Sequence, residues 1–222
     1  MKKIPNLPFF KSLFFSIIFL ATFTNIAAQN KTAELDKLMI QAHENGVFNG
    51  SVLVAENGKV IYRKAFGYAN KETKQLLKPE FCFDLASVSK QFTAMGIMIL
   101  KEKKQLSYDD KITKFFPEFP AYGKDITIRN LLNNTSGMPL YNAFANKDNL
   151  TNVEILKIIE EREALDANIG DRYVYNNAGY VMLGLIIEKV SNKSLAEFLK
   201  ENIFVHLCVN FVYLCETSHD NL

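Results

Sequence analysis

Ser87 and Lys90 are the two side chains of this sequence whose types and spacing could most directly do chemistry. They lie three positions apart where an apolar segment, Phe92 to Leu100, predicts a buried helix. Residues three apart share a helix face, so the serine hydroxyl and the lysine amine can touch. Burial and the positive end of the helix both favour a neutral lysine, which can accept a proton. The backbone N–H of Ser87 could then stabilise an oxyanion, and we expect a serine nucleophile with a lysine base.

The same two residues also have a purely structural interpretation. Ser-x-x-Lys is a short pattern, and about one match is expected by chance in a chain of this length. Ser87 could only cap the helix, and Lys90 could be a solvated side chain. The segment that follows, however, predicts a helix too apolar to lie on the surface, where a lysine without a task is unusual.

Histidine, the usual base for a serine nucleophile, is missing from the centre of the chain. The three histidines are His43, His206 and His219, and none lies between Glu44 and Val205. The sequence also contains no Gly-x-Ser-x-Gly elbow. If this chain does serine chemistry, a lysine or a tyrosine must therefore move the proton.

Two Tyr-x-Asn sequences could supply further site residues. Tyr68 and Asn70 end a predicted hairpin, which favours a strand-end aromatic followed by a turn asparagine. Tyr175 and Asn177 lie on a loop between a glycine turn and an apolar helix that would hold it rigid. Tyr175 could shuttle a proton there, and Asn177 points the same way if the segment is extended, so it could hold a substrate amide. The alternative is that Tyr175 packs and that Asn176 or Asn177 caps the helix.

The elements that must position these residues are one hairpin followed mainly by helices. An amphipathic helix is predicted over Thr32–Asn45, and strands over Ser51–Glu56 and Lys59–Gly67 are joined by the strong turn signal Asn57-Gly58. Capping-box patterns begin two later helices. A lone hairpin is marginal in stability, so it should need further strands beside it. The later helices are predicted over residues 109–116, 127–134, 151–162, 181–190 and 194–202.

Composition indicates an ordinary globular domain. The chain has 222 residues, of which 48% are hydrophobic and 23% charged. The formal net charge is +2. Without the three lysines of the leader (Lys2, Lys3 and Lys11), the chain has 26 − 3 = 23 basic and 24 acidic residues, a net charge of about −1. Because no basic stripe with interleaved aromatic residues is present, nucleic acid is not an expected partner.

Residues 1–28 predict a secretory signal peptide. A basic start precedes an apolar run, Leu13 to Phe23, and small residues end at Ala28 just before Gln29. The apolar run is short for a membrane span. We expect a secreted or periplasmic bacterial protein, and the alternative is an uncleaved anchor that tethers a structural module to the membrane.

The three cysteines do not define a disulfide framework. Cys208 and Cys215 could form a disulfide, whereas Cys82, between two phenylalanines, predicts a buried thiol. Residues 205–222 show neither an amphipathic helix nor a clean strand alternation. Their cysteines, with His206 and His219, lack the usual zinc-ligand spacing, so neither a metal nor another cofactor is expected.

Taken together, three segments resemble the serine β-lactamase and penicillin-binding-protein superfamily, in the branch of class C β-lactamases, D-aminopeptidases and esterases. Residues Ala86–Ala94 are similar to its nucleophile motif, and Tyr175–Tyr180 to its Tyr-x-Asn motif. Residues Leu131–Pro139 are similar to another signature, in which Asn134 stands where histidine is more often found. The resemblance covers Asn49 to Phe204, most of the chain after the leader.

The resemblance implies an α/β (α+β) fold of the β-lactamase/transpeptidase type, with an N-terminal hairpin of an antiparallel sheet and a helical subdomain. It implies that Ser87 attacks an amide or ester carbonyl, Lys90 takes its proton, Tyr175 relays the proton and Asn177 binds the substrate amide. The implied substrates are β-lactams, cell-wall D-amino-acid peptides or small esters. Because lysine and tyrosine both titrate near pH 10 in isolation, the site must lower at least one pKa.

One family feature is missing from this sequence. A third motif, Lys-Thr-Gly or His-x-Gly, normally lies on a C-terminal strand and supplies the second oxyanion donor, but no such motif occurs here. We therefore expect a leader (1–28), an incomplete domain without its C-terminal strands (29–204) and an atypical tail, such as a frameshift would give (205–222). Losing an oxyanion donor typically costs about 10²–10³ in rate. The alternative function is an inactive remnant or a non-catalytic ligand-binding protein.

Overall fold

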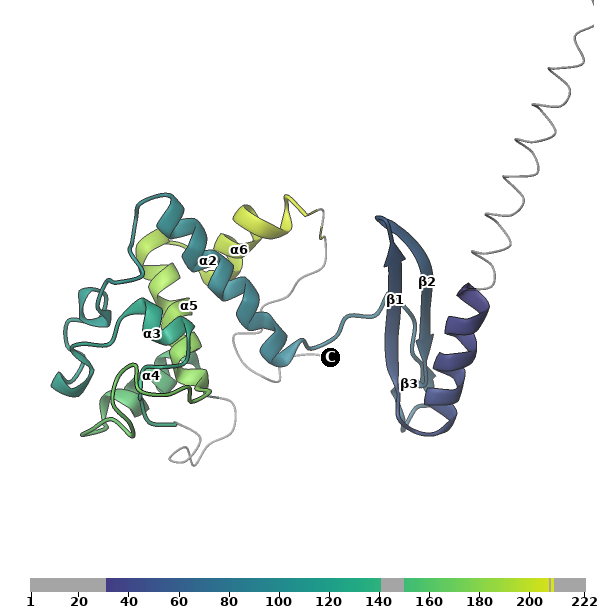
Figure 1. Cartoon of the computed structure of the whole chain (residues 1–222), viewed down its shortest axis with the longest axis horizontal. Coiled ribbons are helices and arrows are strands. Elements are labelled where there is room, and N and C mark those ends of the chain that lie inside the picture. The colour runs from purple at the N-terminus through teal and green to yellow at the C-terminus, as the bar shows by residue number, and fades with distance from the viewer. Residues whose placement is uncertain (1–30, 141–149, 208, 210–222) are drawn as a thin grey trace, which may run out of the picture. The chain divides into compact units, whose positions relative to one another are not determined.

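The computed structural model describes residues 31–140, 150–207 and 209. Contacts within the chain divide it into two units, which we call the hairpin unit (Met1–Phe83) and the helical unit (Asp84–Leu222). Figure 1 shows the strands in the first unit and most of the helices in the second. Predictions for the leader, for Cys208 and Cys215 and for most of the tail lie outside the described residues.

The hairpin unit contains the predicted two-stranded sheet. Strands β1 (Gly50–Glu56) and β2 (Lys59–Phe66) pair antiparallel, with a register irregularity between Val54 and Ala55. The turn residues Asn57 and Gly58 have φ angles of 50° and 75°. Two consecutive positive φ values are the signature of the turn that matches strand twist in short hairpins, so this prediction is confirmed.

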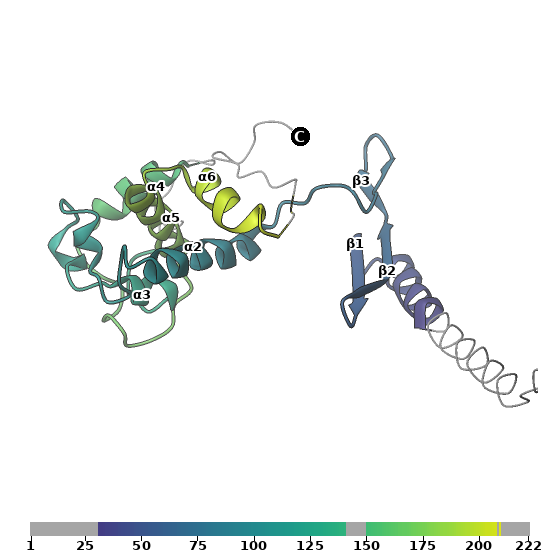
Figure 2. The same ribbon diagram turned by 90° about the horizontal axis from the view of Figure 1, so that it is seen from above.

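A helix over residues 31–44 packs along this hairpin, close to the predicted range (Figure 2). The carboxylate of Asp36 accepts hydrogen bonds from the Tyr62 hydroxyl at 2.8 Å and from Lys64 Nζ at 2.7 Å. Tyr62 is buried, and this burial together with its bond to Asp36 raises the pKa of its phenol to about 12. The polar contacts and the buried ring fix the helix against β2.

A second, shorter hairpin follows that was not predicted. Strands β3 (Tyr68–Asn70) and β4 (Gln75–Leu76) pair antiparallel, and Asn70 Oδ1 accepts the N–H of Thr73 at 2.9 Å. The first Tyr-x-Asn sequence is therefore a strand end with a turn asparagine, as one interpretation predicted. The prediction for Cys82 is wrong: its thiol is exposed, because the segment after β4 carries it outside the packed core.

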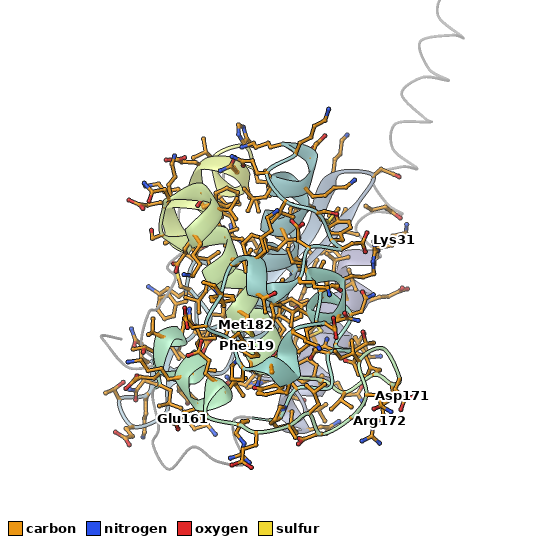
Figure 3. All side chains as sticks on the ribbon, turned by 90° about the vertical axis from the view of Figure 1, so that its left-hand side faces the viewer. Lys31, Phe119, Glu161, Asp171, Arg172 and Met182 are labelled. Atoms are coloured by element: carbon orange, nitrogen blue, oxygen red, sulfur yellow. The ribbon has the colours of Figure 1, made fainter. Side chains whose placement is uncertain are left out.

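Helix α5 (Asn177–Ser191) is the centre of the helical unit. It packs against α2 (Lys90–Glu102), α3 (Ile128–Leu132), α4 (Asn152–Glu160) and α6 (Leu195–Leu199). Its residues Met182, Leu183, Ile186 and Ile187 are almost wholly buried. Figure 3 shows Met182 and Phe119 in the interior of the unit, whereas Asp171 and Arg172 lie at its margin. The apolar run predicted as a helix over residues 181–190 therefore lies at the centre of the core, as expected.

Helix α2 is amphipathic rather than buried on all sides. Ile97 and Leu100 are fully buried, whereas Met95 is 46% exposed and Met98 is 53% exposed. Within the helical unit, only the face of α2 that carries Ile97 and Leu100 is buried, so the predicted burial of the whole helix is not found in this unit. Its apolar composition exceeds what that single face needs.

Capping boxes begin α3, α4 and α6. Those of α4 and α6, at Thr151 with Glu154 and at Ser194 with Glu197, confirm the sequence prediction. The chain after α6 continues as a π-helical turn, Lys200–Phe204, rather than as one regular helix. No helix in the described ranges combines the length and the apolarity that crossing a bilayer requires.

The helix predicted over residues 109–116 is wrong. Only a 3₁₀ turn forms there, Ile112–Lys114. The N–H of Ile112 donates to Ile126 O at 2.9 Å, and the N–H of Ile128 donates to Asp110 O at 3.0 Å. Because these groups pair across to a neighbouring segment, they are not available for i to i−4 helical bonds.

Candidate active site

Ser87 lies in a tight turn directly before α2. A 3₁₀ helix, Ala86–Ser89, leads into the α-helix, and Ala86 has a φ of 43°. This left-handed conformation is unfavourable for a residue with a Cβ. The Asp84 carboxylate accepts the N–H of Ala86 at 2.8 Å, and Ser89 Oγ donates to Ala86 O at 2.6 Å. Both bonds hold the strained turn that presents Ser87.

The 3₁₀ geometry brings Ser87 and Lys90 together. Side chains three residues apart eclipse one another in a 3₁₀ helix, more closely than in an α-helix. Lys90 Nζ donates to Ser87 Oγ at 3.1 Å, and the backbone N–H of Lys90 donates to Ser87 O. The predicted contact between the hydroxyl and the amine is therefore present, and it comes from the turn that precedes α2.

Tyr175 completes this cluster from the loop before α5. Its phenolic oxygen lies 2.6 Å from Ser87 Oγ. Lys90 Nζ lies 5.0 Å from the centroid of the Tyr175 ring and 5.7 Å from that of Tyr180. Tyr180 is itself fixed, because its hydroxyl donates to Leu132 O at 3.1 Å. The lysine thus lies against two aromatic faces while it reaches the serine.

The cluster perturbs the acidity of Tyr175. The Lys90 amine beside it and the hydrogen bond with Ser87 lower the pKa of the phenol from its usual value near 10. A positive charge and a hydrogen-bond donor both favour the phenolate. The chemistry predicted from the sequence requires the site to lower the pKa of either Lys90 or Tyr175. The structure lowers the pKa of Tyr175.

Exposure of the cluster differs from expectation. We expected Ser87 and Lys90 to be a buried pair, but Ser87 is exposed and Lys90 is only half-buried. Tyr175 is 42% exposed. The reason is that the 3₁₀ turn lies at the open end of α2, before the part of the helix that enters the core. A hollow of about 450 Å³ elsewhere on the helical unit is lined by Asp166, Asp171 and Arg172 among others, and none of the three clustered residues lines it.

Asn177 is not joined to this cluster in the described part of the chain. It is the first residue of α5 and is half-buried, and no hydrogen bond links its side chain to Ser87, Lys90 or Tyr175. The adjacent Asn176 has the structural role that the alternative interpretation allowed. Its Oδ1 caps α5 by accepting the N–H of Ala178 at 2.9 Å, and its side chain is almost fully buried. Substrate binding by Asn177 stays a prediction.

Sequence reasoning missed the supporting roles of Asp84, Ser89 and Asn134. Asp84 and Ser89 hold the turn at Ser87, and Asn134 accepts the N–H of Asn176 through its side chain at 3.0 Å. An aspartate two residues before a strained position is a turn signal that could have been read. No group of three or more metal-ligating side chains exists among the residues that the structure describes.

A serine that contacts both a lysine and a tyrosine, on a mixed α/β chain, is typical of serine acyl-transferring hydrolases. The chain belongs to the Beta-lactamase family, whose model matches residues 32–209. This family of serine hydrolases includes β-lactamases, DD-peptidases, amidases and esterases. The resemblance and the fold class predicted from sequence are confirmed.

Comparison with individual proteins gives the same result. Penicillin-binding protein 4* of Bacillus subtilis (strain 168) is 43% identical over 189 residues, which are 82% of this chain and 41% of that protein. EstCE1, described as a hydrolase with promiscuous acyltransferase activity, has a TM-score of 0.70 at 28% identity, covering 82% of this chain and 53% of its own. The D-amino acid amidase of Ochrobactrum anthropi SV3 has a TM-score of 0.61 at 28% identity, covering 71% and 45%. The chain therefore spans about half the length of these relatives.

Proposed function

We propose that this chain carries the acylating part of a serine hydrolase, in which Ser87 attacks an amide or ester carbonyl and forms an acyl-enzyme. One observation carries the proposal: Ser87 Oγ is within hydrogen-bond distance of Tyr175 Oη, at 2.6 Å, and of Lys90 Nζ, at 3.1 Å. A serine hydroxyl is a weak nucleophile until a base removes its proton. Both candidate bases are in contact with it here.

The hydrogen bonds favour a particular proton route. When Lys90 is charged it can only donate, so it occupies a lone pair of Ser87 Oγ. The single hydroxyl proton of Ser87 then points at the Tyr175 oxygen, whose pKa is lowered. In this route Tyr175 reacts as the phenolate, whose negative charge the charged Lys90 stabilises beforehand. As Ser87 Oγ forms its bond to the carbonyl carbon, the serine proton passes to the phenolate oxygen and restores the neutral phenol. In the other route, neutral Lys90 takes the proton directly.

The substrate class follows from the chemistry and from the relatives. An exposed serine fits a carbonyl carried by a larger molecule as well as a small one. The relatives are named for penicillin binding, for acyl transfer and for the amides of D-amino acids. We therefore infer β-lactams, D-amino-acid peptides or amides, and small esters as substrates, with no cofactor.

The acyl-enzyme can be tested by mass. Incubation of the purified chain with a fluorophosphonate or with a penicillin should add one adduct mass per molecule, and peptide mapping should locate it on Ser87. Heat-unfolded protein should remain unlabelled, because the adduct depends on the folded cluster. Labelling of another serine, or equal labelling of the unfolded chain, would contradict the proposal.

A burst measurement separates this function from a non-catalytic binder of the same fold. With an excess of chromogenic cephalosporin or p-nitrophenyl ester, an enzyme releases one equivalent of product and then turns over steadily. One equivalent without further release would identify a chain that acylates but does not complete the cycle. Neither a burst nor turnover with any of these substrates would favour the non-catalytic alternative.

We further infer export, on the basis of the basic start, the apolar run and the small residues of 1–28. Cell-wall peptides are then accessible substrates. N-terminal sequencing of protein recovered from the periplasm or the medium should begin near Gln29. A membrane-bound chain that begins at Met1 would instead support an uncleaved anchor.

A further inference from the structure

Asn134 makes backbone and side-chain contacts on both sides of Tyr175. Its main-chain oxygen accepts the N–H of Val174 at 2.8 Å, and its Oδ1 accepts the N–H of Asn176 at 3.0 Å. One residue thus receives the peptide N–H groups that precede and follow Tyr175. Asn134 is itself buried, at 9% exposure, so neither bond is exchanged easily with water.

The pairing determines the direction of the Tyr175 side chain. Asn176 is extended, with φ of −138° and ψ of 116°, and successive side chains of an extended segment point to opposite sides. Asn176 points inward, where its Nδ2 donates to Met138 O at 2.8 Å and to Pro139 O at 3.2 Å. Tyr175 therefore points outward, toward Ser87.

The conformation of Asn134 is suited to this double contact. Its φ is 54°, in the left-handed region that asparagine adopts more readily than most residues with a side chain. This bend ends α3 and turns both the carbonyl and the side chain of Asn134 toward the Tyr175 loop. The next residues hold the same loop further upstream, because Gly170 N–H donates to Thr135 O at 2.8 Å and Asp166 N–H donates to Gly137 O at 2.9 Å.

We propose that Asn134 is a positioning residue: by holding the peptide groups on either side of Tyr175, it places the phenolic oxygen within hydrogen-bond distance of Ser87. The inference rests on the proposed function for its catalytic consequence, but the placement itself can be measured without turnover. This assigns a structural role to the Leu131–Pro139 segment. Its residues hold the loop that carries Tyr175, whereas the 3₁₀ turn before α2 presents Ser87.

Two substitutions separate the backbone shape of Asn134 from its side-chain acceptor. Asn134→Gly keeps the left-handed conformation at no steric cost but lacks Oδ1. Asn134→Asp keeps an acceptor oxygen at the same place and tolerates the same backbone. The neighbouring Asn133 is exposed and lies outside the cluster, so Asn133→Gly is the matched control.

The direct measurement is titration of Tyr175 by NMR, with a carbon-13 label at Cζ of tyrosine and assignment through Tyr175→Phe. In the unaltered chain the phenol should titrate below its usual pKa, because Lys90 and Ser87 are beside it. In Asn134→Gly the titration should move up toward the ordinary value, while urea unfolding confirms that the variant is folded. Asn133→Gly should leave the depressed titration unchanged. The carboxylate of Asn134→Asp adds a negative charge that itself opposes ionisation of the phenol, so this variant is judged by turnover.

Turnover should follow the same order. We expect Asn134→Gly to lower kcat on the order of 10²-fold, because small misplacements of a catalytic group have effects of this size, with a lesser change in KM. Asn134→Asp should recover most of this loss. A folded Asn134→Gly variant with an unmoved Tyr175 titration would overturn the inference. So would an Asn134→Asp variant that recovers none of the lost turnover at high pH, where the phenol is ionised in both variants. Absence of turnover in every form would instead defeat the proposed function, and the titration would still decide the role of Asn134.

Discussion

Replacing Ser87 by alanine should lower the rate of hydrolysis by about 10³-fold or more, to the level that binding and orientation alone supply. The substitution removes the one atom that contacts both Tyr175 and Lys90. Because Ser87 is exposed in the 3₁₀ turn before α2, the free energy of unfolding should change little. Steady-state rates with a chromogenic cephalosporin and with p-nitrophenyl esters, beside urea unfolding, are the measurements.

A second serine provides the control for this experiment. Ser107 is exposed and has no contact with the cluster, so Ser107→Ala should keep the full rate and the full adduct yield. If Ser87→Ala retained the rate of the unaltered chain, the nucleophile would have to be another residue. The family relationship would stand in that case, but the catalytic assignment would not.

Replacing Tyr175 by phenylalanine should have the next largest effect, a loss of about 10²–10⁴ in kcat, which is the usual contribution of a positioned acid or base. Phenylalanine keeps the ring that lies against Lys90 and removes only the oxygen at 2.6 Å from Ser87. The expected loss therefore reports proton transfer rather than packing. Tyr173→Phe, two residues earlier and 66% exposed, is the matched control and should be close to unaltered.

The pH profile tests which group takes the proton. If the Tyr175 phenolate is the base, the rate rises with pH through the pKa of that phenol, which the Lys90 charge and the Ser87 hydrogen bond lower below 10. Lys90→Gln removes the charge, so the rising limb should move to higher pH and the rate near neutrality should fall. A limb that keeps its position in Lys90→Gln but disappears in Tyr175→Phe would contradict this electrostatic coupling.

Much of the local structure could be predicted because its causes are local. The Asn57-Gly58 turn, the capping boxes at Thr151 and Ser194 and the apolar helix after Tyr175 each depend on residues a few positions apart. The contact of Ser87 with Lys90 is of the same kind, because three residues of spacing suffice to place them on one face. These features need no knowledge of the remaining chain.

Predictions failed where distant segments decided the outcome. The region around Ile112 has a helical pattern, but its N–H donates to Ile126, so a 3₁₀ turn forms instead of a helix. Helix α2 carries apolar residues on two faces, but within the helical unit only the face with Ile97 and Leu100 is buried, whereas Met95 and Met98 are exposed. The hydrophobic pattern of a sequence shows which face of a helix is apolar. Whether that face is buried depends on which other elements pack against it in the tertiary structure.

The sequence by itself determined the residue types of the site, the spacing of Ser87 and Lys90 and the family to which the chain belongs. Only the tertiary structure decided that Tyr175, 88 positions away, reaches Ser87, and that Asn134 holds the loop that carries it. The physical reason is that such contacts depend on packing around α5 and on backbone hydrogen bonds between separate segments. No periodicity within either segment encodes the distance between them.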